Sequence, residues 1–290
     1  MIKSKKHLAF LLNTKWDRLE YIVSNLDKYY YKKEEAKYDK DGNPRLDNKG
    51  NIKIRVIYPS TGDLKILQDK INKRILRNVR LSNAAYGGVK GKDNISNSEK
   101  HLGKKYKFVT DLKDCFPSVN SGMVYQSFIR NGFSSDISSM LTKLTTYKNQ
   151  IPQGARTSTY VCNIVMQTLD EKLLDLCNTN DIVYTRYIDD LTFSSQSDFK
   201  HLNKDITKVI QSESLKLSHR KTGYVLGSTM ITGIRVPNNK IDISDEMKTK
   251  ISSPAKYNEK QKKGQHQYTK RVVGEERFQK IIAKIKDEHN

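Results

Sequence analysis

The chain has 290 residues, 36% of them hydrophobic, so it is long enough to bury a core and to form two or three lobes. Lysine and arginine outnumber aspartate and glutamate by 53 to 32, and the charge of +21 indicates a polyanionic partner, for which nucleic acid fits better than an anionic membrane surface. The sequence has no apolar run of transmembrane length, no secretory signal after Met1 and no metal-ligand spacing among its three cysteines, so we expect a cytoplasmic protein with reduced, buried thiols and no membrane partner.

The N-terminal region begins with helix-forming sequence and then becomes polar. Apolar residues recur at helical spacing between His7 and Tyr30, which predicts one or two amphipathic helices. Residues 31–53 contain the turn signals Asp41–Pro44 and Asp47–Gly50, so we expect an exposed hairpin or loop there.

A basic strand and a helix are predicted next. Basic and apolar residues alternate in Lys53–Pro59, as they do in a half-buried strand, and this alternation puts Lys53 and Arg55 on one face. That face could bind a triphosphate, and an ordinary charged surface is the alternative. Apolar residues from Leu64 to Val79 recur at helical spacing and predict a helix with one buried side.

Two further segments could bring polar groups to a site. Tyr106–Leu112 is predicted to be a strand, with Asp111 near its end. The loop Gln150–Ala155 contains proline and glycine and precedes a long apolar periodic segment, so we expect a loop and then a helix. Gln153 and Gly154 could lie against a base pair, and an ordinary helix entry is the alternative.

The stretch Ile182–Ser195 is rich in β-branched and aromatic residues on both sides of Asp189 and Asp190, which predicts a β-hairpin with the two aspartates at its tip. Two adjacent carboxylates repel each other, and a hard cation such as Mg²⁺ would neutralise them. Asp111 offers a third carboxylate if the two strands share a sheet edge. A solvated turn is the alternative for the Asp189-Asp190 pair alone.

The C-terminal third is predicted to contain a helix, paired strands and a basic end. Residues 197–217 have helical periodicity, and Gly223–Ile243 indicates strands with turns at Gly227-Ser228 and Pro237–Asn239. Between Lys248 and Lys286 there are 12 lysine and arginine residues and 3 acidic residues, which indicates a nucleic-acid-binding surface or a partly ordered segment.

Three of these segments, in chain order, resemble motifs A, B and C of reverse transcriptases: Asp111–Phe116 (DLKDCF), Ile151–Ala155 (IPQGA) and Tyr187–Asp190 (YIDD). The resemblance continues upstream in Arg55–Pro59 and Leu64–Gln68 and downstream in Leu217–Thr222. It implies an α+β right-hand polymerase fold with fingers, a palm made of an antiparallel sheet plus helices, and a small thumb. The implied divisions are N-terminal helices and fingers at 1–105, with fingers continuing around 130–160, a palm with motifs A to E at 106–235, and a basic thumb or C-terminal segment at 236–290.

Within that family the chain looks most like bacterial retron reverse transcriptases. Asn97–His101 (NSEKH) resembles their NAxxH signature, and Ile231–Gly233 (ITG) resembles their VTG tripeptide. The sequence departs from the family pattern at Ile188 and Ser98, where alanine is usual, and at two positions where proline is usual, Arg156 and Thr159. These departures affect packing and loop shape, so they bear on fidelity or subfamily.

The resemblance implies a role for each matching residue. Asp111, Asp189 and Asp190 would be catalytic and would bind two Mg²⁺ ions for DNA synthesis on an RNA template. The implied nucleotide contacts are Lys53 and Arg55 at the phosphates, Phe116 as a steric gate below the sugar, and Gln153 and Gly154 beside the nascent base pair. The remaining implied residues are Lys221, as proton donor to pyrophosphate, and an RNA-binding set of Asn97, His101, Ile231, Thr232 and Gly233. A core aromatic is the alternative for Phe116, and a surface charge for Lys221.

The implied function is reverse transcription of part of a structured non-coding RNA into branched RNA–DNA, called msDNA, in defence against phage. The implied partners are this RNA and its msDNA product, dNTPs, and a retron effector or toxin protein. Two other hypotheses stay open: another bacterial reverse transcriptase, of the abortive-infection or group II intron type, and a non-catalytic RNA-binding scaffold. Intron enzymes usually carry further domains that 290 residues would not hold, and intact Asp111, Asp189 and Asp190 disfavour the scaffold.

Overall fold

Apolar side chains of the described residues gather into two buried clusters. The computed structural model describes residues 2–39, 42–47, 49–218, 222–253 and 257–287. The larger cluster joins the N-terminal helices to a four-stranded sheet and its helices. The smaller one joins a three-stranded sheet to the C-terminal helices. The architecture is α+β, as the sequence predicts.

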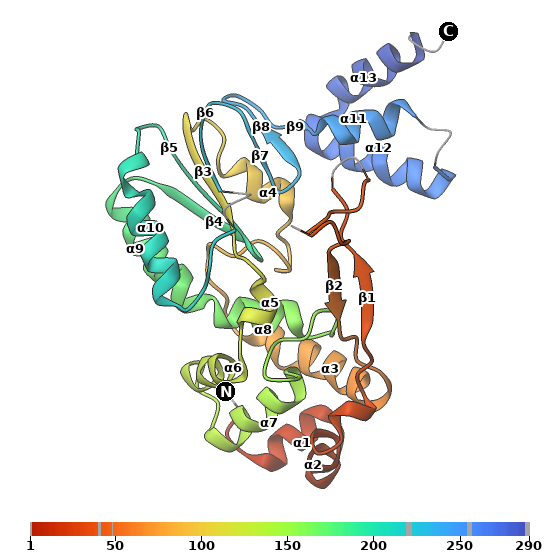
Figure 1. Ribbon diagram of the computed structural model, residues 1–290, viewed down its shortest axis with the longest axis vertical. Coiled ribbons are helices and arrows are strands. Elements are labelled where there is room, and N and C mark those ends of the chain that lie inside the picture. The colour runs from red at the N-terminus through yellow and green to blue at the C-terminus, as the bar shows by residue number, and fades with distance from the viewer. Residues whose placement is uncertain (1, 40–41, 48, 219–221, 254–256, 288–290) are drawn as a thin grey trace.

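One part of the larger cluster consists of helices and lies at the end of the molecule opposite the C-terminus (Figure 1). Leu8, Leu19, Leu64 and Ile71 are fully buried there, which confirms the amphipathic helices expected from the spacing of the apolar residues. Ser4 caps the first of them by accepting a hydrogen bond from the His7 N–H. The helices of this part are α1 (Lys5–Leu12), α2 (Trp16–Val23), η1 (Leu26–Lys28), α3 (Gly62–Arg74), η2 (Leu76–Asn78), α6 (Ser121–Arg130) and α7 (Ser135–Thr145).

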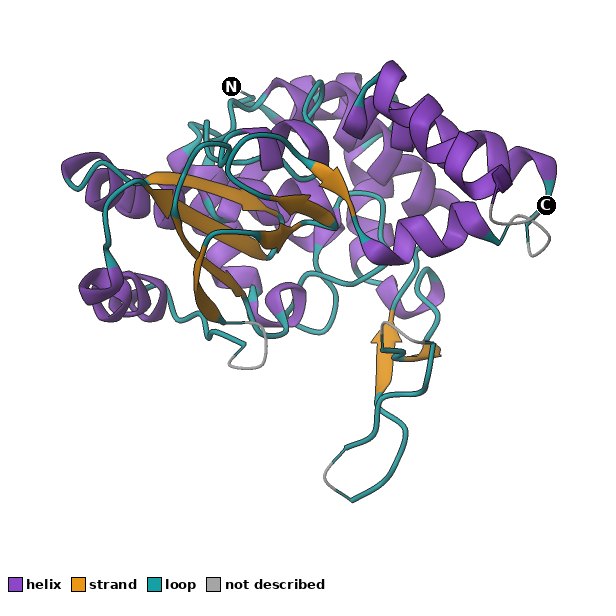
Figure 2. Ribbon diagram, turned by 90° about the horizontal axis from the view of Figure 1, so that it is seen from above, coloured by secondary structure: helices purple, strands orange, loops and turns teal. Residues whose placement is uncertain are grey.

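An antiparallel hairpin of β1 (Lys33–Ala36) and β2 (Ile54–Ile57) projects from the body of the protein (Figure 2). The pairing extends beyond the strands through bridges from Tyr38 to Pro44 and from Leu46 to Ile52. The expected exposed hairpin is therefore confirmed. The prediction of a half-buried strand is wrong, because a projecting two-stranded ribbon has no layer against either face, and Ile54 and Val56 are 51% and 39% exposed.

The four-stranded sheet has the strand order β4-β5-β3-β6, with all neighbours antiparallel. Phe108 and Phe193 face each other across β3 and β5, with ring centroids 5.8 Å apart, and both are buried. Helices α9 and α10 cover one side of this sheet (Figure 1). The strands are β3 (Tyr106–Asp111), β4 (Val183–Tyr187), β5 (Asp190–Ser195) and β6 (Gly223–Leu226).

The helix expected after residue 157 is divided in two at Met166, and the helix expected at 197–217 is shorter than predicted. The three cysteines are buried, as expected, and none of them forms a disulfide. The helices of this region are α5 (Cys115–Ser118), α8 (Ser158–Val165), α9 (Gln167–Thr179), η3 (Lys200–Leu202) and α10 (Asn203–Ser212).

A second sheet, of order β7-β8-β9, packs with the C-terminal helices and with α4. Gly227-Ser228 does not close a hairpin, because β6 pairs with β3 and β7 pairs with β8, so this turn joins two sheets. The expected division at 235/236 falls inside β8, and we propose that the C-terminal unit begins near Thr229 instead. Its elements are α4 (Asn94–Glu99), β7 (Thr229–Ile231), β8 (Ile234–Val236), β9 (Asp242–Ile243), α11 (Asp245–Ser252), α12 (Glu259–Val273) and α13 (Glu275–Asp287).

The basic end of the chain is helical over most of residues 245–287, so the interpretation of a partly ordered segment does not hold for the residues described there. Among the described parts of the chain, none of the helices has the length and apolar character needed to span a membrane.

Candidate active site

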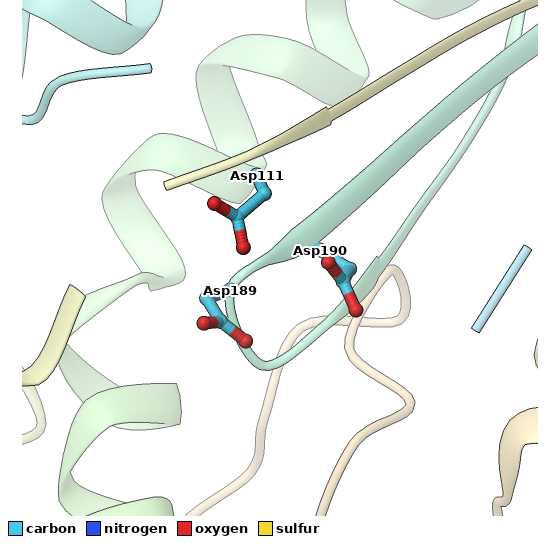
Figure 3. A group of neighbouring side chains, drawn as sticks. All are labelled: Asp111, Asp189 and Asp190. Atoms are coloured by element: carbon cyan, nitrogen blue, oxygen red, sulfur yellow. The ribbon is translucent and has the colours of Figure 1, made fainter. Parts of the chain in front are cut away.

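Three carboxylates meet where β3 ends beside the turn between β4 and β5 (Figure 3). Antiparallel register puts Asp111 opposite Asp190, and the pairing of Tyr187 with Asp190 closes the turn that carries Asp189. A ligand oxygen from each of the three lies within 4.8 Å of the others. The structure thus brings together all three carboxylates that the sequence predicts.

The donor set fits a divalent metal ion. Asp111 is 7% exposed and the other two aspartates are half-buried, so their negative charges are only partly screened by water. Several carboxylate oxygens in such a space are suited to hard cations such as Mg²⁺, Mn²⁺ or Ca²⁺. The backbone supports the site as well, because the Leu112 N–H donates to the Asp189 carbonyl at 2.8 Å.

Two of the three carboxylates, Asp111 and Asp190, line a cleft of about 940 Å³, and three separate parts of the chain form its walls. Strand ends of the four-stranded sheet form one wall, and the turn between β7 and β8 forms another. The tip of the projecting hairpin supplies the third wall, through Asp39, Pro44, Arg45 and Leu46. Sequence reasoning did not identify Arg45, because nothing in a polar turn segment indicates which residue will face a distant strand.

The β7–β8 turn in this cleft is held by helix α4. Thr232 and Gly233 both have positive φ angles, 46° and 84°, which two-residue hairpin turns of type I′ require and which a β-branched threonine rarely adopts. Asn94 Nδ2 donates to the Thr232 carbonyl at 3.1 Å, and Asn97 Nδ2 lies 3.4 Å from Thr232 Oγ1. The two retron-like segments of the sequence are therefore in contact with each other.

Burial contradicts part of the expected RNA-binding set. Asn97, His101 and Ile231 are 1%, 0% and 1% exposed, so their side chains do not reach a solvent-borne RNA. The expectation of direct RNA contact is wrong for these three residues, because the chain uses them to pack α4 against the two sheets. Thr232 is half-buried and Gly233 is exposed, and both line the cleft.

His101 connects α4 to the sheet that carries the triad. Its ring nitrogens lie 2.7 Å from Ser194 Oγ and 2.8 Å from Thr185 Oγ1. Burial, helped by the charges of Lys107 and Lys104, lowers the pKa of His101 from 6.5 to about 3. The imidazole is therefore neutral at physiological pH, and its contacts with Ser194 and Thr185 are part of the protein interior.

The four residues expected near the triphosphate and the base pair lie on the hairpin and at its base. Lys53 precedes β2, and its N–H donates to the carbonyl of the cleft residue Arg45 at 2.7 Å. Arg55 is exposed on β2. The Gln153 carbonyl accepts from the Tyr58 N–H at 2.8 Å, and Gly154 packs beside Pro59 with a φ of 94°. The motif B segment thus anchors the hairpin.

The two remaining predicted site residues are Phe116, which the structure describes, and Lys221, which it does not. Phe116 lies on α5, directly after the chain leaves β3 through Asp114, whose φ is 48°. The Phe116 ring is half-buried and packs on the larger cluster, so it keeps an exposed side near the end of β3. Lys221 lies outside the residues that the structure describes.

Comparison with known proteins supports the resemblance read from the motifs. The family model for reverse transcriptase (RNA-dependent DNA polymerase) matches residues 44–269 of this chain. The retron Ec86 reverse transcriptase of Escherichia coli is 33% identical over 206 residues, which cover 69% of this chain and 64% of that protein. The retron Se72 reverse transcriptase of Salmonella heidelberg (strain 579083-10) is 30% identical over 215 residues, which cover 72% of this chain and 52% of that protein. The chain therefore spans only part of the length of these two relatives.

A solved structure of telomerase from Candida albicans, in complex with the TWJ fragment of telomeric RNA, matches with a TM-score of 0.51. The two chains are 12% identical, and the match covers 79% of this chain and 50% of that one. At this identity the likeness concerns the fold alone, and it confirms the right-hand polymerase architecture expected from the sequence.

The buried histidine gives the folded protein a specific dependence on pH. The unfolded chain takes up a proton on His101 near pH 6.5 and the folded chain only near pH 3, so this group's contribution to stability is present above pH 6.5 and is lost as the pH falls towards 3. We expect the free energy of unfolding to fall by about 2 kcal/mol from this source between pH 7 and pH 5, because the loss begins near pH 6.5 and continues at roughly 1.4 kcal/mol per pH unit. Urea unfolding at several pH values measures it.

His101→Gln should remove this part of the pH slope, whatever its effect on absolute stability. The matched control is His201→Gln, which changes an exposed histidine and should keep the wild-type slope. An unchanged slope in His101→Gln would contradict the assignment of a neutral, buried imidazole.

Proposed function

Because this chain belongs to the reverse transcriptase (RNA-dependent DNA polymerase) family, we propose that it synthesises DNA on an RNA template. The observation that carries the proposal is the convergence of Asp111, Asp189 and Asp190, two of which line the cleft, at the positions that match the family's motifs A and C. Three clustered carboxylates would weaken RNA binding by a non-catalytic scaffold, since the carboxylates would repel the phosphates of the RNA.

We propose that the triad binds two Mg²⁺ ions. Such ions, when bound, activate the primer hydroxyl and stabilise negative charge on the leaving pyrophosphate. The chain's own contribution is to hold three carboxylates on two hydrogen-bonded strands, so that little reorganisation is needed when a nucleotide arrives. Lys221 would deliver a proton to pyrophosphate, a role that rests on the family resemblance of its position.

Nucleotide selection is assigned to the residues around this site. Lys53 and Arg55 on the hairpin would neutralise the incoming phosphates, and Arg45, which lines the cleft, is a third candidate for that role. Phe116 would block a ribose 2′-hydroxyl, since its half-buried ring follows directly from the strand that carries Asp111. Gln153 and Gly154 would act at the base of the hairpin, beside the nascent base pair.

We further propose that the template is a structured non-coding RNA and that the product is branched msDNA, as the retron-type relatives suggest. Exposed Gly233 and half-buried Thr232 would contact this RNA in the cleft. Lys262, Lys263 and Lys270 line a second hollow, on α12, and would bind RNA phosphates away from the triad. A retron effector partner and a part in phage defence rest on the retron assignment alone, and a cytoplasmic location is proposed from the sequence.

Removing one metal ligand tests the catalytic assignment. Asp189→Asn or Asp190→Asn should lower kcat for DNA synthesis at least about a thousandfold, equivalent to about 4 kcal/mol of transition-state stabilisation. RNA affinity should stay within about threefold of wild type, since the lost charge serves the reaction and not the template. Primer extension with labelled dNTPs and filter binding measure the two quantities. Asp205→Asn, on α10, where the aspartate side chain is 50% exposed and pairs with Lys208, is the control and should be fully active. Normal extension by Asp189→Asn would sink the assignment.

Replacing the proposed steric gate should change sugar selection. Phe116→Ala should raise ribonucleotide incorporation relative to deoxyribonucleotide incorporation by about 10- to 100-fold, because rejection of a hydroxyl by shape is worth about that much. The measurement is the ratio of kcat/KM for rGTP and dGTP on one template. Phe116→Tyr keeps the ring and should keep the wild-type ratio. If Phe116→Ala also keeps it, the ring is merely part of the core.

The retron assignment is tested by the nucleic acid that the protein carries. Protein purified from its native host should hold a small RNA joined to single-stranded DNA through a branch, and Asp190→Asn should retain the RNA without the DNA. Sequencing with and without debranching enzyme identifies the branch. A heterogeneous pool without branched species would favour a different kind of reverse transcriptase.

A further inference from the structure

The turn that carries Asp189 has an unfavourable backbone. Ile188 lies between the paired residues Tyr187 and Asp190, and its φ is 62°. A β-branched residue rarely adopts this left-handed conformation, and hairpin turns usually place glycine, asparagine or aspartate there. Surrounding contacts must therefore hold Ile188 in place.

Arg186 supplies such a contact from the protein interior. Its Nη1 donates to the Ile188 carbonyl oxygen and to Asn163 Oδ1, both at 2.9 Å. Its Nε and Nη2 donate to the two carboxylate oxygens of Asp170, both at 2.8 Å. Arg186, Asp170 and Asn163 are all 0% exposed. One guanidinium thus ties the turn to α8 and α9.

The Ile188 carbonyl matters because it belongs to the peptide group that precedes Asp189. That group is planar, so the direction of its carbonyl also fixes the backbone nitrogen of Asp189. The peptide group that follows Asp189 is held too, since the Asp189 carbonyl accepts from the Leu112 N–H at the end of β3. Asp189 is therefore fixed on both sides, towards α8 and α9 by Arg186 and towards Asp111 by β3.

The segment Ala84–Gly88 packs against the turn that carries Ile188. The Arg186 N–H donates to the Ala84 carbonyl at 2.7 Å, and Asn163 Nδ2 donates to the Gly87 carbonyl at 2.9 Å. A Cβ on Gly87 would lie 2.4 Å from Ile188 Cγ1 and 2.7 Å from the Ile188 backbone nitrogen, so only glycine leaves room for the turn. Asn163 therefore connects the segment Ala84–Gly88 to the Arg186 guanidinium.

We propose that Arg186 is a positioning residue that keeps Ile188 in its left-handed conformation and so holds Asp189 where it shares a metal site with Asp111 and Asp190. The proposal rests on the proposed function. Stability alone explains the buried Arg186–Asp170 pair poorly, because apolar side chains can often replace such pairs without loss. Lysine would keep the charge next to Asp170 but lacks the fork of donors that also reaches Asn163 and Ile188.

The test compares Arg186→Lys in two backgrounds, the wild-type chain and Ile188→Gly. Mn²⁺ binding is followed by electron paramagnetic resonance, and the Mg²⁺ concentration for half-maximal primer extension is measured in parallel. In the wild-type background, Arg186→Lys should weaken Mn²⁺ binding and raise the Mg²⁺ requirement by about tenfold. In the Ile188→Gly background the same change should have less than about a threefold effect, because glycine adopts a positive φ without strain.

Asp189→Asn is the reference for both measurements and should abolish the titrated Mn²⁺ site. If Arg186→Lys fails to fold, Gly87→Ala takes its place: it keeps the ion pair, displaces Ile188 and should weaken Mn²⁺ binding in the same way. Equal effects of Arg186→Lys in the two backgrounds, or unchanged Mn²⁺ affinity, would overturn the proposal.

Failure of the proposed function gives a different pattern. A wild-type chain whose Mn²⁺ binding depends on Asp189 but which makes no DNA would refute the polymerase and leave the positioning role to be decided by the binding data. Mn²⁺ binding that Asp189→Asn leaves unchanged would overturn both.

Discussion

The antiparallel register between β3 and β5 is the constraint on which the site depends. Side chains alternate between the two faces of a strand, so a slip of one residue would send Asp111 and Asp190 to opposite faces of the sheet. Buried aromatic pairs fix that register from within: Phe193 of β5 packs against Phe108 of β3 and stacks on Tyr184 of β4. The apolar side of the sheet thus determines where the mutually repelling carboxylates lie.

Polar side chains in the protein interior hold the two turns that flank the site. On one side, the Arg186–Asp170 pair and Asn163 hold the turn before Asp189, and on the other, α4 holds the Thr232-Gly233 turn through Asn94 and Asn97. Both turns contain a β-branched residue with a positive φ, a conformation that costs about 1 to 3 kcal/mol. Among the described non-glycine residues with a positive φ, these two are the β-branched ones, and one lies next to Asp189 and the other lines the cleft.

Much of this could be predicted from the sequence. The alternating β-branched and aromatic residues around Asp189-Asp190 indicated a hairpin, and a strand ending at Asp111 indicated a partner, because both patterns are local and short. Arg186 could also have been noticed, since an arginine on the same strand face as Tyr184, in a strand with no other charged residue, signals a buried ion pair. Its partner Asp170 could not, because nothing in the α9 sequence marks which acidic residue points inward.

The sequence by itself determined the order of the elements, the two aspartate segments, the excess of positive charge and the family, since these depend on residue types and their spacing. Tertiary structure alone decided which exposed residues share a cleft and which motif residues are buried. Asn97 and His101 form a motif that resembles an RNA-binding signature, yet they face the interior, because α4 packs between two sheets. The hairpin strand alternates like a half-buried one, yet it stands exposed, because it pairs with a single partner strand away from either core. Periodicity reports which side chains share a face, and only the packing of distant segments decides what, if anything, covers that face.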